Sequence, residues 1–108
     1  MAKDKFTKPI VGTAKTLNFT DTSNSLPDLG VVFNANMRKI IFDVDGDPQD
    51  PMLVARYWED TTAPTNTEGF PLQSGERVEL TLEQANGFRV KSLSGTVAVN
   101  LTQYEEEV

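Results

Sequence analysis

The stretch richest in side chains that could do chemistry is FDVDGDPQD, residues 42–50. Its four carboxylates belong to Asp43, Asp45, Asp47 and Asp50. Calcium prefers such clusters of oxygen ligands. An EF-hand loop starting at Asp43 would need Gly at its sixth position and Glu at its twelfth, where this chain has Pro48 and Val54. We therefore expect a turn without a bound metal, and an ion site is the alternative.

The other polar residues do not assemble a catalytic group. Glu59 and Asp60 are adjacent, and neighbouring side chains of an extended chain point to opposite sides, so they do not converge as a glycosidase pair would. The chain has no His and no Cys, which excludes Ser-His-Asp triads, thiol nucleophiles, disulfides and zinc–thiolate sites. The many hydroxyls lack an evident activating base. We expect a protein that is not an enzyme and binds no cofactor.

The charge balance is acidic, with 16 Asp and Glu against 10 Lys and Arg and a net charge of −6. Nucleic acids and anionic lipids are usually bound by basic surfaces, so we expect no nucleic acid and no membrane as partner. No apolar run approaches the length of about 18 residues that a membrane span needs. The N-terminal residues lack the apolar stretch of a signal peptide, and we expect a chain that is made and used without export.

Apolar and polar residues alternate along several short stretches, as in antiparallel strands with one buried face. The clearest stretches are residues 38–44, 77–82 and 95–104, and weaker ones are 15–19, 30–33, 52–58 and 88–92. The side chains expected to face the core are Ile40, Phe42, Val78, Leu80, Val97, Val99 and Leu101. Turn-forming clusters separate the stretches. This pattern predicts seven or eight short strands in an all-β sandwich or barrel.

Residues 81–87, TLEQANG, depart from the strand pattern. Thr81 stands at a capping position, Gln84 follows three residues later, and Asn86-Gly87 closes the segment. This order is typical of a capping box followed by a helix stop. We expect one helical piece of about one or two turns here.

The strand expected at 52–58 is largely apolar on both faces. Leu53, Ala55 and Tyr57 share one face, and Met52, Val54 and Trp58 share the other with Arg56. A strand of this kind is either central and covered on both sides, or one of its faces is covered by another chain.

The longest gap between expected strands covers residues 59–75, which are rich in Thr, Pro and Gly. Loops of this length are uncommon in compact domains unless they are functional or disordered. Trp58 precedes the gap and Phe70 lies within it. Each of these two is either buried beneath the loop or an anchor at an interface, because aromatic residues are enriched at binding hot spots.

Both ends of the chain are too polar to pack well. We expect a basic N-terminal arm at residues 1–12, a β-domain at 13–104 and an acidic tail at 105–108. Segments of this kind are disordered or become ordered on a partner. The arm is the better candidate for partner binding, because Lys3, Lys5 and Lys8 oppose an acidic body.

Residues 52–104 resemble small all-β virion proteins of tailed bacteriophages. The likeness lies in VARYWEDTTAPTNTEGFPLQSGERVELT, residues 54–81, where a strand ending in aromatics runs into an acidic turn, a Thr-Pro-Thr loop and an alternating strand. FRVKSLSGTVAVNLTQYE, residues 88–105, is similar to their paired last strands. The resemblance implies a single antiparallel β-sandwich with jelly-roll-like or Ig-like connectivity.

The resemblance also implies a structural role in the virion, after synthesis in the host cytoplasm. The leading role is a capsid decoration (cement) protein that bridges capsid subunits through its surface loop and terminal arm. Its partners would be the major capsid protein or other virion subunits, with a homo-oligomer on the particle. The expected interface consists of Trp58, Glu59, Thr65, Glu68, Phe70, Lys3, Lys5 and Lys8.

Two other roles remain open. A neck or tail accessory protein would use the same type of domain. A carbohydrate- or host-binding sandwich would instead use Tyr57, Trp58 and Phe70 as stacking platforms for sugar rings.

Overall fold

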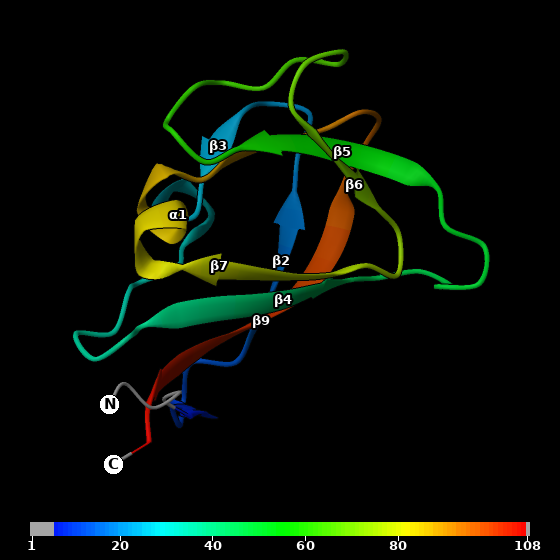
Figure 1. Cartoon of the computed structure of the whole chain (residues 1–108). Helices are drawn as coiled ribbons and strands as arrows, with labels where there is room; N and C mark the ends of the chain where they lie inside the picture. The colour runs from blue at the N-terminus through cyan, green and yellow to red at the C-terminus, as the bar shows by residue number, and fades with distance from the viewer. Residues whose placement is uncertain (1–5, 108) are drawn as a thin grey trace, which may run out of the picture.

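The computed structural model describes residues 6–107 and consists mainly of short antiparallel strands (Figure 1). The strands within these residues are β1 (Thr7–Pro9), β2 (Lys15–Phe19), β3 (Asn24–Ser25), β4 (Lys39–Val44), β5 (Leu53–Trp58), β6 (Phe70–Gln73), β7 (Arg77–Thr81), β8 (Arg89–Ser92) and β9 (Val97–Glu106). A 3-10 helix, η1 (Pro27–Leu29), and an α-helix, α1 (Leu82–Gly87), complete the described part. The all-β prediction is confirmed, with nine described strands in place of the seven or eight expected.

The strands form two sheets. The first has the order β1-β9-β4-β7, and β2 also pairs with β9. β2 pairs with residues 97–101 of β9 and β1 with residues 104–106, so β2 and β1 lie end to end along the edge of β9 that β4 leaves free. The second sheet has the order β3-β8-β5-β6.

Strands β2 to β9 pair in order from the outermost two inward. β2 pairs with β9, β3 with β8, β4 with β7 and β5 with β6. These strands form a long antiparallel ribbon that is folded over, because β4 also pairs with β9 and β5 with β8. Where the ribbon passes between the sheets, Ser92 N donates to Thr20 O at 2.7 Å.

One hydrophobic core lies between the two sheets. The side chains that the alternation assigns to the core are all buried, with no more than 8% of their surface exposed. Phe19, Phe42 and Phe88 form its centre, with ring centroids 5.6–6.0 Å apart. Burial of each such side chain stabilises the fold by about 1.5–3 kcal/mol. The prediction of the core faces is confirmed.

Residues 30–33 do not form the strand that their apolar run predicts. η1 is closed by Gly30 in the left-handed conformation (φ 89°), and the chain then continues without a strand partner. The backbone of the residues that follow Gly30 is bound by a side chain of β9 and not by another strand. Gln103 Nε2 donates to Val32 O at 2.9 Å, and Gln103 Oε1 accepts from Asn34 N at 2.7 Å. Gln103, with 3% of its surface exposed, thus replaces the expected strand pairing.

The first sheet extends beyond the expected domain limits of residues 13 and 104. Residues 7–9, expected in the arm, form β1, and β9 runs on to Glu106. Lys8 Nζ lies 4.0 Å from Glu105 Oε1 across this pair. Backbone pairing along the edge of β9 explains why these polar segments are ordered. The rest of the expected arm and tail, residues 1–5 and 108, lies outside the described residues.

The predicted helix is confirmed as α1. Gln84 N donates to Thr81 Oγ1 at 3.2 Å, and Thr81 N donates to Gln84 Oε1 at 2.8 Å, which is the reciprocal capping box. α1 has six residues, and no helix within residues 6–107 is long and apolar enough to cross a membrane.

The role of Gln103 can be tested by Gln103→Leu. The variant keeps a side chain of similar size but leaves Val32 O and Asn34 N without their partner. We expect the free energy of unfolding, measured by urea titration, to fall by about 1–3 kcal/mol. Gln73→Leu, at an exposed position of β6, is the control and should change it by less than about 0.5 kcal/mol. Equal stability of Gln103→Leu and the wild type would contradict the assignment.

Candidate functional site

Five of the eight predicted interface residues lie from the end of β5 to the start of β6. The gap expected at 59–75 is shorter than predicted, because residues 70–73 form β6 and pair with β5. Phe70 lies opposite Tyr57, and Pro71 opposite Arg56. β6 was not predicted because it contains Pro71, and Pro is found mainly in edge strands. β6 is indeed an edge strand of the second sheet. The remaining connection, residues 59–69, is called the cover loop below.

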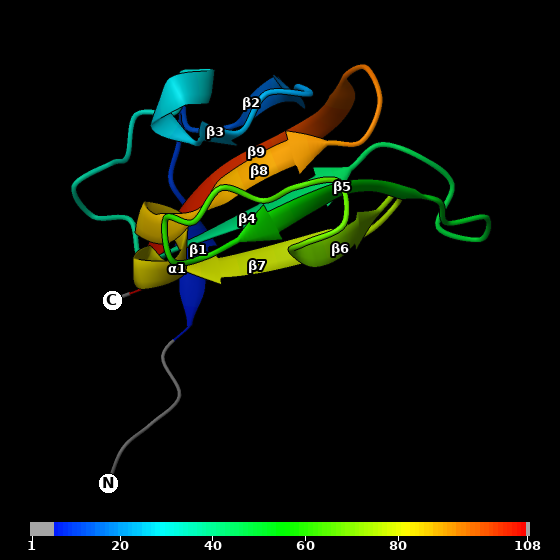
Figure 2. The same cartoon turned by 90° about the horizontal axis from the view of Figure 1, so that it is seen from above.

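The cover loop is bound to the outer face of the second sheet (Figure 2). Arg56 Nε donates to Asn66 O at 3.1 Å and Arg56 Nη1 to Gly69 O at 3.0 Å. Lys91 Nζ donates to Asn66 Oδ1 from the neighbouring strand β8. Pro64 is buried at the centre of the loop. β5 is a central strand of the second sheet, and the cover loop covers part of its outer face, whereas Met52 and Leu53 at its beginning stay 65% and 42% exposed.

The first residues of the cover loop rest on the end of α1. Thr61 N donates to Gly87 O at 2.8 Å, and Gln84 Nε2 donates to Glu59 Oε1 at 3.5 Å. Thr61 has a φ of 71°, which β-branched residues rarely adopt. A Cβ on Gly87 would lie 2.1 Å from Glu59 O, so this helix ends in Gly because of close backbone approach. The loop is thus fixed at both of its ends.

Three aromatic residues meet beside the cover loop. The Phe70 ring lies 5.5 Å from the Tyr57 ring and 5.2 Å from the Trp58 ring, and Tyr57 in turn lies 5.3 Å from the core residue Phe88. Trp58 and Tyr57 are half-buried, whereas 47% of Phe70 is exposed. Trp58 is therefore neither a core residue nor a free anchor, and Phe70 is the most accessible apolar group of the three.

The other predicted interface residues have different surroundings. Thr65 Oγ1 accepts from Thr67 N and from Glu68 N, so this hydroxyl shapes the loop from within. The Glu68 side chain is exposed, and that of Glu59 is partly buried against α1. Lys8 lies on β1, outside the cover loop. Lys3 and Lys5 lie outside the described residues.

Three of the four carboxylates in and after the end of β4 bind protein groups. Asp43 forms a two-point ion pair with Arg77, at 2.9 and 3.2 Å. Asp45 Oδ1 accepts from Asn100 Nδ2 at 3.1 Å, and Asp47 Oδ1 accepts from Gln49 N at 2.9 Å. Within residues 6–107, no three acidic, His or Cys side chains gather closely enough to hold a metal ion.

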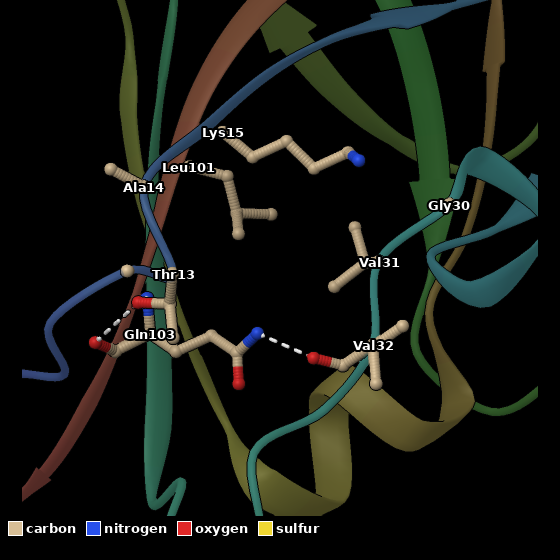
Figure 3. Close-up of a pocket in the computed structure, with 9 residues that line it drawn as sticks. Thr13, Ala14, Lys15, Gly30, Val31, Val32, Leu101 and Gln103 are labelled. Atoms are coloured by element: carbon tan, nitrogen blue, oxygen red, sulfur yellow. Dashed lines mark hydrogen bonds between the residues drawn. The ribbon is translucent and has the colours of Figure 1, made fainter.

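A second candidate is a hollow of about 300 Å³ beside β9 (Figure 3). Residues 12–15, residues 30–32 and two side chains of β9, Leu101 and Gln103, line it. Lys15 extends over the hollow toward Gly30 in Figure 3. One feature of the sequence is associated with this hollow. Lys15 shares the inward face of β2 with Leu17 and Phe19, where a charged residue is unexpected.

Comparisons with known proteins add no assignment. No protein-family model, curated protein or solved structure matched the chain. The likeness to phage virion proteins remains a prediction.

The contact between α1 and the cover loop can be tested by Gly87→Ala. In a helix, Ala is normally more stable than Gly by about 0.5–1 kcal/mol. Here we expect the opposite sign, with a loss of about 1–3 kcal/mol in the free energy of unfolding, because the new methyl group meets Glu59 O. Asn86→Ala, at the exposed neighbouring position, is the control. A stabilised Gly87→Ala protein would show that the loop can move away from the helix without loss.

The surroundings of Tyr57 predict that the free energy of unfolding depends on pH in the alkaline range. Burial raises the pKa of the Tyr57 hydroxyl, and the charges of Glu59 and Glu76 raise it further. The unfolded chain releases this proton near pH 10, and the folded chain keeps it to higher pH. The contribution of the Tyr57 hydroxyl to the free energy of unfolding is therefore fully present below about pH 10, and it is lost as the pH rises through the folded pKa. Urea titrations at increasing alkaline pH should show a smaller loss in Tyr57→Phe than in the control Tyr104→Phe; equal losses would refute this.

Proposed function

We propose that this protein is a structural subunit of a tailed-phage virion that binds neighbouring capsid subunits and stabilises the shell. Two things support the proposal: the resemblance of residues 52–104 to small virion proteins, and an exposed surface made by the cover loop and Phe70, below called the contact surface, whose loop is hydrogen-bonded to Arg56 and Lys91. The second observation carries the argument.

The contact surface is ordered in the isolated chain. Arg56 and Lys91 hold the cover loop from beneath, while Thr61, Thr62, Thr65, Asn66, Thr67 and Glu68 remain exposed above. Ordering a loop on binding costs about 1–2 kcal/mol per residue. A loop that is already ordered avoids that cost, so a modest interface can still bind. This preorganisation is useful for a protein whose work is contact.

Phe70 is the proposed anchor of the contact. Its ring is supported from behind by Tyr57 and Trp58 and is half exposed at the edge of the second sheet. Aromatic side chains held in this way are typical hot spots, and charges at the rim mainly affect register and association rate. Glu68 and Glu59 would be such rim charges. Several copies on a particle would add weak contacts by multivalency, with the basic residues Lys3, Lys5 and Lys8 as a second point of attachment.

We also infer that the two sheets form a jelly-roll sandwich. A jelly roll is a double-sheet structure of eight strands, made when an antiparallel ribbon is rolled. Strands β2–β9 pair from the two ends inward and fall into the orders β2-β9-β4-β7 and β3-β8-β5-β6. This strand order supports the jelly-roll alternative over the Ig-like one. Capsid proteins are among the proteins built on this fold, and so are lectins and enzymes, so the fold supports the role only weakly.

Two alternative roles use the same surface. A neck or tail accessory protein would bind other virion subunits through the cover loop. A carbohydrate-binding module is favoured by one specific observation, the convergence of Tyr57, Trp58 and Phe70, whose rings could stack on sugars.

The proposal can be tested with capsids that lack the protein, prepared from the phage that encodes it. Purified protein is mixed with these particles and co-sedimented. We expect saturable binding to heads, weakened about tenfold or more by Phe70→Ser. Met52→Ser is the matched control, because Met52 is also exposed but lies beside the opposite end of β5.

The other outcomes separate the alternatives. Binding to tails or necks in place of heads would favour the accessory role. A change of Trp58 fluorescence on addition of sugars, lost in Phe70→Ser, would favour the carbohydrate module. Head binding that Phe70→Ser leaves intact would place the contact elsewhere and overturn the proposed surface.

A further inference from the structure

The N-terminal strand β1 lies at an extension of the first sheet. β4 pairs with β9 from Val99 to Tyr104, so within the described residues Glu105 and Glu106 pair with β1 alone. The end of β9 and β1 thus form a two-stranded ribbon that lies apart from the second sheet (Figure 1). Ribbons of two strands are only marginally stable on their own. This part of the chain can therefore open without unfolding the rest.

β1 is held mainly by its backbone pairing. Pro9 is exposed, and so is Phe6, with 76% of its surface in solvent. The Lys8 ammonium lies 4.0 Å from the Glu105 carboxylate, and this exposed pair contributes little to stability. Ile10, directly after β1, is the buried side chain of the segment. The strand thus depends on backbone hydrogen bonds and on one apolar anchor.

β1 and β2 follow the same edge of β9, but three extra residues stand between them. Five residues, 10–14, connect the two strands and face only two residues of β9. The extra residues form a tight turn, in which Thr13 N and Thr13 Oγ1 donate to Ile10 O at 3.2 and 2.8 Å. Gly12 has a φ of 85°, as the third residue of a type II turn requires.

This turn has the properties of a hinge. Val11 is 98% exposed, and apart from its chain neighbours no heavy atom lies within 4 Å of the place that a Cβ of Gly12 would take. Opening the turn therefore breaks the bonds between Thr13 and Ile10 but separates no packed side chains at the turn itself. Once extended, the three extra residues add about 10 Å of reach to β1.

We propose that β1 is exchanged between copies of this chain, so that residues 6–10 of one copy pair with residues 103–107 of another. A second copy is the partner that fits, because the segment that matches this edge of β9, with Ile10 as its anchor, is the one that occupies it within the chain. Exchange of an identical element repeats the same contacts between copies and needs no new interface.

The exchange depends on concentration. A tethered arm has an effective concentration of about millimolar at its own site, so exchange competes where copies are similarly crowded. The inference does not rest on the proposed virion role, although neighbouring copies on a particle would meet this condition.

Disulfide trapping tests the exchange directly, because the chain has no cysteine of its own. Thr7 lies opposite Glu106, and a disulfide needs Cα atoms about 4.4–6.8 Å apart. The single variants Thr7→Cys and Glu106→Cys are mixed at about 1 mM each with oxidised glutathione, and the covalent heterodimer is quantified by mass spectrometry. We expect it to form about tenfold or more faster than in the control mixture of Thr7→Cys with Glu83→Cys, whose cysteine is at an exposed position of α1.

Two changes at the hinge, each introduced into both cysteine proteins, test the route. Deletion of residues 11–13 joins β1 and β2 into one strand in continuous register with β9. It should reduce heterodimer formation to the rate of the control mixture. Gly12→Val should raise the rate about fivefold or more, because a β-branched residue at a φ of 85° weakens the closed turn.

Each outcome supports or overturns the inference. The double variant Thr7→Cys/Glu106→Cys should form its disulfide within one chain at about 10 μM, and failure to do so would refute the register of β1. Heterodimer formation at the rate of the control mixture would overturn the exchange, as would an undiminished rate after the deletion of residues 11–13. If circular dichroism shows that the deletion protein does not fold, Gly12→Val decides alone, and an unchanged rate in that variant would overturn the hinge.

Discussion

The structure depends most on the register of β9, the longest described strand. It pairs with β2 and β1 along one edge and with β4 along the other, and it supplies Val97, Val99 and Leu101 to the core. A shift of one residue would turn these side chains to solvent. It would also withdraw Gln103 from residues 32–34. The pairing of both chain ends, the core and the path of the chain after η1 therefore depend on the same register.

The parts of the fold predicted from the sequence are those that local alternation determines. Residues 38–44, 77–82 and 95–104 alternate clearly, and their core faces were found. Residues 30–33 carry a strand-like pattern, but the backbone in this region is bound by the side chain of a distant glutamine and not by a neighbouring strand. β3 and β1 are too short for any period, and β6 contains Pro71. Whether these segments form strands depends on pairing with segments far away in the sequence, and a local pattern does not contain that information.

The candidate site was predicted in part for the same reason. The aromatic residues near position 58 and the unusual length of the following segment pointed to the right region. The sequence did not show that Phe70 is on a strand opposite Tyr57, or that Arg56 and Lys91 hold the loop over the sheet. The hollow was missed because its walls come from three distant segments, and only the inward position of Lys15 hinted at it. Charged side chains on an apolar face therefore warrant as much attention as clusters of carboxylates.

The position of Pro71 in β6 has a consequence for behaviour in concentrated solution. β6 forms one edge of the second sheet, and its four residues include one that has no backbone N–H to donate. A strand from another molecule could pair with this edge only briefly and incompletely. For copies crowded together, this edge of the second sheet would therefore be a poor template for strand pairing.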